Sequence, residues 1–199
     1  MAEGDKDYAG LLDKMVQMKA ALRVPVIVKE TGCGIAAEQY RLLLDAGFRY
    51  FDCAGAGGTN FPAIEAARQG VALSEEFASW GVPTCWSLID AQAVLPQDAV
   101  LLGSGGVQNA ADAVRVLALG ADAVGITGVV LRLVVEQGVE AAVQYFQQLE
   151  EELRCYLLLL GAQIPEQLRR VPLVVTGETK DFIACRGYEL AQLCKKRRG

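Results

Sequence analysis

The sequence predicts an α/β protein that forms the C-terminal half of a TIM (β/α)8 barrel, with four parallel strands and outer helices. Apolar runs typical of strands alternate with segments typical of helices, which favours parallel strands joined by helical crossovers. Glycine-rich turns follow three of these runs, at residues 52–60, 103–109 and 125–128. Because a closed barrel needs eight strands and about 250 residues, we expect a single half-barrel domain over residues 1–199.

The first elements follow from helical spacing and from one short apolar run. Residues 8–22 carry apolar side chains at helical spacing, and we expect this stripe to pack in the core. The run 25–30 predicts the first strand, with Lys29 and Glu30 at its end. Glu30 is expected either to pair with Lys29 or to face the barrel interior. Residues 36–46 predict a helix, since a glycine follows where helices commonly end.

The middle of the chain is less regular. The second strand is predicted over 49–53 and the third over 99–103. Between them, 61–98 shows little periodicity apart from a short helix at 77–80. Residues 83–90 have a composition rich in strand-forming residues, but a proline in a first helical turn favours a helix, which we expect.

The last third predicts one more strand and several helices. Asn109 is a suitable N-cap for a helix over 110–119, and the fourth strand is expected over 122–126. Residues 131–160 indicate one long helix, or two that meet near Gly138. The remaining predicted elements are an extended piece at 172–176 and a helix at 179–185.

Composition excludes several classes of function. A net charge of −5 disfavours nucleic-acid binding, and we expect the basic residues 195–198 to be a solvated terminus. No apolar run reaches the roughly 18 residues of a membrane span, and the acidic, polar first residues do not resemble a signal peptide. Six cysteines without a C-x-x-C pair fit a reduced, cytoplasmic protein. The chain has no histidine, which excludes catalysis by Ser-His-Asp or Cys-His groups within it.

The glycine-rich turns indicate an anion site. Glycine allows close approach of a ligand to the backbone, and free N–H groups at a turn into a helix attract phosphate. In a β/α barrel the turns after the last two strands commonly bind phosphate. A half-barrel also leaves two open sheet edges and one uncovered apolar face, so we expect a homo-oligomer.

Several motifs together resemble one family, the type 2 isopentenyl-diphosphate delta-isomerases. The motifs are Pro-Val-Ile-Val-Lys-Glu-Thr-Gly-Cys-Gly at 25–34, Gly-Gly-Thr-Asn-Phe at 57–61, Ser-Gly-Gly at 104–106, Ala-Leu-Gly-Ala at 118–121 and Pro-Leu-Val-Val-Thr-Gly-Glu-Thr at 172–179. The resemblance implies an FMN-dependent barrel enzyme of isoprenoid biosynthesis. Its small-molecule diphosphate substrate would be interconverted between isopentenyl and dimethylallyl forms by reduced FMN, with Mg²⁺ on the diphosphate and NADPH as reductant.

The same resemblance implies a set of flavin-binding residues but no catalytic residue and no metal ligand in this chain. The set comprises Lys29 after the first strand, Ala54 and Thr59 in the next turn, Gly105, Gly106, Val107 and Gln108 after the third strand, and Thr127 and Gly128 after the fourth. Three of them depart from the family, and one of these is Thr127, where the family often has alanine. Ala54 stands where the family often has serine, and Gln108 where it often has arginine, so phosphate binding should depend more on backbone N–H groups.

The family's other half would hold the remaining flavin contacts, a histidine-containing diphosphate site and a Gln-Glu pair. We therefore expect this chain alone to be a poor catalyst. Two alternatives remain open. One is a non-catalytic FMN- or phosphate-binding half-barrel, or a truncated fragment. The other is a different FMN-dependent barrel oxidoreductase.

Overall fold

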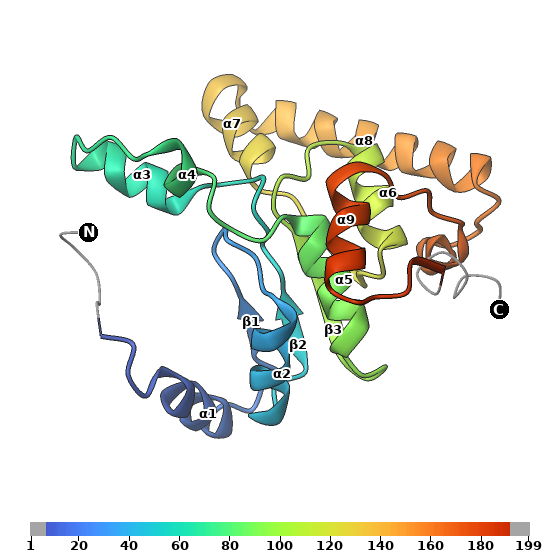
Figure 1. The fold of residues 1–199 in the computed structure, drawn as a ribbon. Helices are drawn as coiled ribbons and strands as arrows, with labels where there is room; N and C mark the ends of the chain where they lie inside the picture. Colours follow the sequence, from blue (N-terminus) through green and yellow to red (C-terminus); the bar gives the residue numbers. More distant parts are fainter. Residues whose placement is uncertain (1–6, 192–199) are drawn as a thin grey trace.

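The computed structural model describes residues 7–191, and its ribbon is drawn in Figure 1. The basic residues 195–198 and Cys194 lie outside this range. The elements follow one another as α1 (Leu11–Ala21), β1 (Ile27–Lys29), α2 (Ala37–Asp45), β2 (Tyr50–Asp52), α3 (Phe61–Arg68), α4 (Glu75–Ala78), α5 (Thr84–Val94), β3 (Val100–Ser104), α6 (Ala110–Ala118), β4 (Ala123–Gly125), α7 (Gly128–Gln137), α8 (Val139–Leu159), the 3₁₀-helix η1 (Pro165–Arg170) and α9 (Gly177–Cys185).

The four strands form one parallel sheet in the order β1-β2-β3-β4, which confirms the predicted α/β half-barrel. The register pairs Lys29 with Asp52, Asp52 with Leu102, and Ser104 with Gly125. Because side chains alternate between the faces of a strand, Lys29, Asp52 and Ser104 share one face of the sheet. All four strands end at the same edge, so the turns that follow them gather there.

The opposite face of the sheet packs against helices. Phe51 of β2 and Leu101 of β3 are almost fully buried, in one core cluster with Tyr40 of α2, Leu88 of α5 and Val116 of α6. These residues are apolar on both sides of the strand–helix contact, so their burial is the main source of stability for the half-barrel.

Helix α5 forms as expected, and the N-cap prediction for α6 is also confirmed. The Asn109 side chain accepts a hydrogen bond from the backbone N–H of Asp112 at 2.9 Å. Two helices meet at Gly138, whose φ of 92° lies in the left-handed region and ends α7 before α8 begins.

Two expectations need correction. Residues 61–68 are helical, with Asn60 as N-cap, where the sequence showed little periodicity. The apolar stripe of α1 is not a core stripe, because this helix has no buried residue. Leu12 and Met15 pack against the core cluster, whereas Leu11 and Met18 are exposed.

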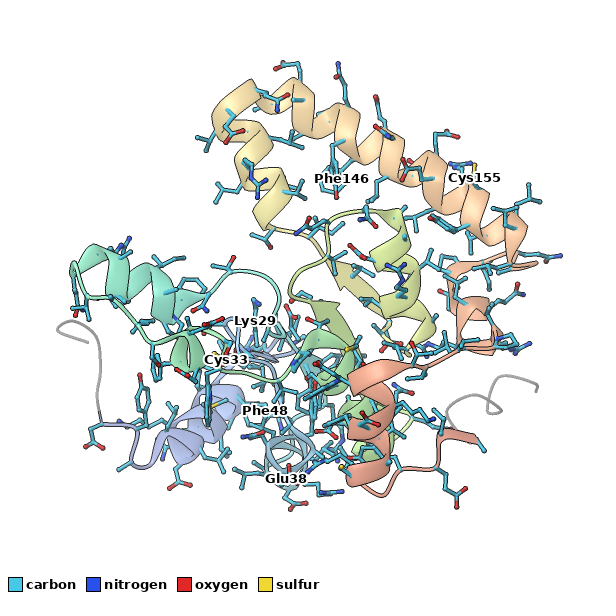
Figure 2. All side chains as sticks on the ribbon, turned by 45° about the horizontal axis from the view of Figure 1, so that its top comes forward. Lys29, Cys33, Glu38, Phe48, Phe146 and Cys155 are labelled. Atoms are coloured by element: carbon cyan, nitrogen blue, oxygen red, sulfur yellow. The ribbon has the colours of Figure 1, made fainter. Side chains whose placement is uncertain are left out.

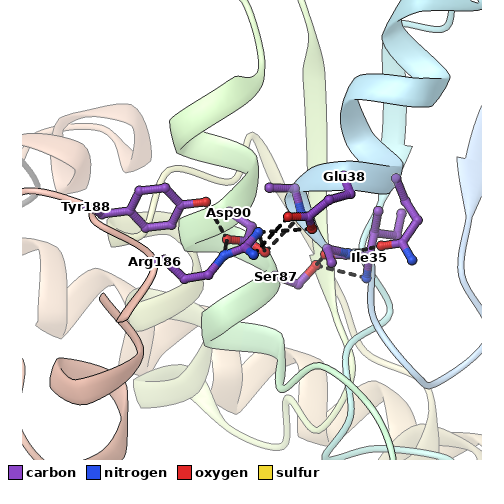
Figure 3. Close-up of polar contacts among 9 residues, drawn as sticks. Ile35, Glu38, Ser87, Asp90, Arg186 and Tyr188 are labelled. Carbon is purple, nitrogen blue, oxygen red and sulfur yellow. Dashed lines mark hydrogen bonds and ion pairs between the residues drawn. The ribbon is translucent and has the colours of Figure 1, made fainter. Parts of the chain in front are cut away.

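A polar network fastens α9 to the rest of the fold (Figure 3). Asp90 of α5 is 1% exposed, and its carboxylate accepts hydrogen bonds from the Ala37 backbone N–H, the Tyr188 hydroxyl and the Arg186 guanidinium. Arg186 also forms a two-pronged pair with Glu38 at 2.9 and 3.0 Å. Asp90 therefore links α2, α5 and the end of α9.

Within residues 7–191, no helix combines the length and apolar character needed to cross a membrane.

Candidate functional site

The candidate site lies at the carboxyl ends of the strands. Lys29 ends β1, and its ammonium lies 3.4 Å from the carboxylate of Asp52, which ends β2. Asp52 is 8% exposed, and the hydroxyl of Ser104, at the end of β3, donates to its Oδ1 at 2.5 Å. The Ala54 N–H donates to the same oxygen at 3.2 Å. Three neighbouring strand ends thus hold one cation in a defined position.

Lys29 does not pair with the Glu30 carboxylate, which was one of the two alternatives. Its ammonium donates to the Glu30 backbone carbonyl at 3.0 Å. The Glu30 carboxylate instead accepts the backbone N–H groups of Thr31, Gly32 and Cys33 at 2.5–2.6 Å. Glu30 therefore orders the turn after β1, and the side chain of Lys29, which is 54% exposed, extends from that edge (Figure 2).

The glycine-rich turns after β2 and β3 pack directly on one another. A Cβ on Gly105 would overlap the Gly55 carbonyl oxygen, and one on Gly106 would overlap the carbonyl oxygen of Gly57. Both glycines also have positive φ, 101° and 76°. Glycine is required here by close backbone contact between two turns. Thr84 adds to this contact by donating to the Gly105 carbonyl at 2.7 Å.

The turn after β1 joins the same assembly through Thr59. Gly32 lies so close to the Thr59 carbonyl that a Cβ at position 32 would overlap it. Thr59 itself is exposed. Ala54 is 4% exposed and is the one non-glycine residue with positive φ, 34°, in the described part of the chain. Ala54 therefore stabilises the turn, because its side chain is buried and its N–H donates a hydrogen bond to the Asp52 carboxylate.

The N–H group of Gln108 already has a partner. It donates to the Asp112 carboxylate at 3.2 Å, and the Gln108 carbonyl accepts from the Tyr145 hydroxyl at 3.1 Å. Asp112 in turn pairs with Arg115 at 2.9 Å. A depression beside this turn is lined by Gly105, Gly106, Val107, Asp112 and Arg115, among others. Val107 is 6% exposed and packs in the core cluster.

The start of α7 offers better anion donors. Thr127 precedes this ten-residue helix and Gly128 is its first residue; both are exposed. The first N–H groups of a helix have no partner within it, and the helix dipole favours an anion there. A Cβ at Gly128 would meet no atom within 4 Å, so the surroundings of this helix end are open.

The cysteines nearest the site are poor candidates for redox or nucleophilic chemistry. Burial raises the pKa of the Cys53 thiol, and burial together with the charge of Glu30 raises the pKa of Cys33. Both thiols are therefore protonated at neutral pH. In the described residues no cluster of three or more histidine, cysteine or acidic side chains could hold a metal ion.

The sequence reasoning missed Asp52 and Ser104 as members of the site. Both belong to motifs that were noticed, but their contact with Lys29 follows from the strand register. The structure brings Lys29, Asp52 and Ser104 together, and it places Thr59 against Gly32 of the turn after β1.

This geometry defines a class: parallel β/α-barrel proteins whose polar site lies at the carboxyl ends of the strands. The sequence profile of the FMN-dependent dehydrogenases matches residues 11–174, and the chain belongs to that family. Its fold is similar to that of mandelate oxidase with benzoyl-formic acid, with a TM-score of 0.61 and 24% identity over 80% of this chain and 42% of the oxidase.

Curated relatives confirm the resemblance noted in the sequence. An isopentenyl-diphosphate delta-isomerase of Geobacillus sp. (strain WCH70) is 42% identical over 95% of this chain and 54% of its own length. An enzyme of the same name from Methanopyrus kandleri is 37% identical over 96% of this chain and 53% of its own length. The chain spans about half the length of the curated relatives it matches.

Proposed function

We propose that this chain forms the FMN-binding half of an isopentenyl-diphosphate delta-isomerase. The observation that carries the proposal is the Lys29 ammonium, held at the site edge by Asp52 and Ser104. The relatives at 37–42% identity are named isopentenyl-diphosphate delta-isomerases, and the family resemblance implies that the reaction interconverts isopentenyl and dimethylallyl diphosphate. We propose a single half-barrel domain in the cytoplasm, acting on a small-molecule diphosphate in isoprenoid biosynthesis.

The described residues fit an anionic flavin cofactor. Lys29 supplies a positive charge whose position is set by three strand ends, and the start of α7 at Thr127 and Gly128 supplies open N–H donors for phosphate. Gly105, Gly106, Val107 and Gln108 would complete the phosphate turn, although the Gln108 N–H would first have to leave Asp112. Ala54 and Thr59 would border the flavin from the turn after β2.

When bound, reduced FMN would supply the proton-transfer chemistry, with NADPH as reductant and Mg²⁺ on the substrate diphosphate. The part of this chain would be to bind and orient. Asp52 keeps the Lys29 ammonium at a defined place, and the turns of Gly55 and Gly105 pack on one another at the same edge of the sheet. The diphosphate and metal ligands would come from outside residues 7–191, in which no metal-binding cluster is found.

The two other functions are less well supported. An oxidoreductase resembling mandelate oxidase shares the fold at 24% identity. We would expect a catalytic histidine in such an enzyme, and this chain contains none. A non-catalytic flavin-binding half-barrel would have the same site as an isomerase half. Only a measurement of isomerase activity can therefore distinguish the two.

The direct test is isomerisation of isopentenyl diphosphate with FMN, NADPH and Mg²⁺. The chain alone is expected to give little or no product. Addition of the missing half of a close relative should restore turnover, and Lys29→Met should lower it by about 100-fold through lost electrostatic stabilisation. Lys180→Met, at an exposed position of α9, is the matched control and should have no effect. Bound FMN without any restored turnover would favour the non-catalytic half-barrel.

A further inference from the structure

The turn that follows β1 is held in place by two buried side chains of α5. The Ser87 hydroxyl donates to the Ile35 carbonyl at 2.6 Å and accepts the Ile35 N–H at 3.1 Å. Further along α5, the Asp90 carboxylate accepts the Ala37 N–H at 2.9 Å. Ser87 is 0% exposed and Asp90 is 1% exposed. The end of this turn and the start of α2 are therefore fixed by hydrogen bonds that water does not replace.

The same turn contacts the candidate site at its other end. The Glu30 carbonyl accepts the Lys29 ammonium at 3.0 Å, and the Glu30 carboxylate accepts the three backbone N–H groups that follow. The Gly34 N–H donates to the Ala54 carbonyl at 3.2 Å, in the turn after β2. Hydrogen bonds therefore fix this turn from the Lys29 ammonium to the start of α2.

The orientation of the Asp90 carboxylate depends on two residues that follow α9 (Figure 3). The Tyr188 hydroxyl donates to Asp90 Oδ1 at 2.7 Å, and the Arg186 guanidinium donates to both carboxylate oxygens at 3.3 Å. The same guanidinium pairs with Glu38 in the first turn of α2. Loss of either donor would leave a buried carboxylate with fewer partners and would weaken its hold on the start of α2.

Helix α9 is an element that can open separately from the rest of the fold. Ile183 is the one buried residue of this helix, and Phe182 stacks on Trp86 of α5 with ring centroids 4.6 Å apart. Elements with few buried apolar contacts open locally at a lower free energy than global unfolding. Docking of α9 therefore depends strongly on the hydrogen bonds of Arg186 and Tyr188 to Asp90.

We propose that Arg186 and Tyr188 are positioning residues for the candidate site. They act through Asp90 on the turn after β1, and this turn sets the position of the Lys29 ammonium. Because coupling between two places is reciprocal, a ligand that binds at Lys29 should also hold α9 more firmly. The ligand is the flavin of the proposed function, and this last step rests on that function.

The first test is amide hydrogen exchange without flavin, so that its outcome is independent of the proposed function. Arg186→Gln should speed exchange of the Gly34 and Ile35 N–H groups by about 10-fold or more relative to that of Val116, a core residue of α6. Tyr188→Phe removes a single hydroxyl and should give a smaller effect in the same direction. Arg186→Lys keeps the cation and should restore part of the protection.

Thr179→Val is the matched control on the same helix. It removes the hydroxyl that accepts the Trp86 indole N–H at 3.2 Å, and it leaves the hydrogen bonds to Asp90 in place. It should loosen α9 without changing the exchange of the two turn amides. Equal acceleration by Thr179→Val and Arg186→Gln would overturn the proposal, because general loosening of α9 would then be the cause. Unchanged exchange of the turn amides in Arg186→Gln would also overturn it.

Flavin binding gives the second test. FMN and riboflavin should each bind Arg186→Gln about 10-fold more weakly, because the change displaces Lys29 and leaves the proposed phosphate donors in place. In the unmodified protein, FMN should slow exchange of the Tyr188 N–H, which donates to Ile183, more than that of Ala162 beyond α8. Unchanged affinity for both ligands, or a loss confined to FMN, would contradict the coupling. If the unmodified chain bound no flavin, the proposed function would fail and the exchange test alone would decide.

Discussion

Replacing Asp90 with alanine is expected to destabilise the protein by about 3 kcal/mol, because it breaks a buried, multiply bonded ion pair. The carboxylate is 1% exposed and accepts from Ala37, Arg186 and Tyr188, so its removal leaves a backbone N–H, a guanidinium and a hydroxyl without this partner. Urea denaturation followed by far-ultraviolet circular dichroism would measure the loss in the free energy of unfolding.

The matched control is Glu38→Gln, which removes the other carboxylate bound to Arg186. The Glu38 side chain is 62% exposed, so this change should cost less than about 1 kcal/mol. The Arg186 hydrogen bond lowers the pKa of Glu38. Because the folded state therefore favours ionised Glu38, its contribution is present above the unfolded pKa and is lost as the pH falls through the lowered pKa. Equal losses for both variants at neutral pH would contradict the role given to Asp90.

Replacing Gly105 with alanine is expected to destabilise the protein by about 3 kcal/mol or more, through backbone strain and overlap together. Its φ of 101° disfavours any side chain, and the new Cβ would overlap the Gly55 carbonyl. The turns after β2 and β3 would have to separate, and this would disturb the hydrogen bond from Thr84 to the Gly105 carbonyl. The midpoint of thermal unfolding and urea denaturation would both report the loss.

Gly57→Ala separates the two causes. Gly57 also has a positive φ, 124°, but a Cβ there would meet nothing within 4 Å. It should therefore show the cost of strain alone, about 1–2 kcal/mol. If Gly105→Ala were no more destabilising than Gly57→Ala, close contact between the two turns would not be the reason for glycine at position 105.

The sheet could be predicted from the sequence because each strand is an apolar run, and a glycine or a charged residue marks the turn that follows it. The helix at 61–68 was missed although Asn60 and Pro62 provide ordinary start signals. The role of α1 was misjudged for another reason. An apolar stripe indicates that a helix face needs a partner, but not how completely that partner covers it: Leu12 and Met15 pack against the core cluster, and the helix still has no buried residue.

The site was predicted in part. Lys29 follows from its position at a strand end, but its partner Asp52 depends on the register between β1 and β2, which no local pattern specifies. The Gln108 N–H is not free for a ligand because it donates to the Asp112 carboxylate. The two residues are only four apart in the sequence, so this local hydrogen bond could have been predicted. The mutual packing of the glycine turns could not be foreseen, because glycines that approach a ligand and glycines that approach another turn have the same sequence pattern.

The most direct test of the flavin site is a comparison of FMN with riboflavin by isothermal titration calorimetry. The two ligands differ only by the phosphate, for which we propose a position at the start of α7 and the turn after β3. FMN should bind at least about 100-fold more tightly than riboflavin, a difference of about 2.8 kcal/mol. Equal affinities for the two ligands, or no binding of FMN by the folded protein, would contradict a phosphate-bearing cofactor site at the carboxyl ends of these strands.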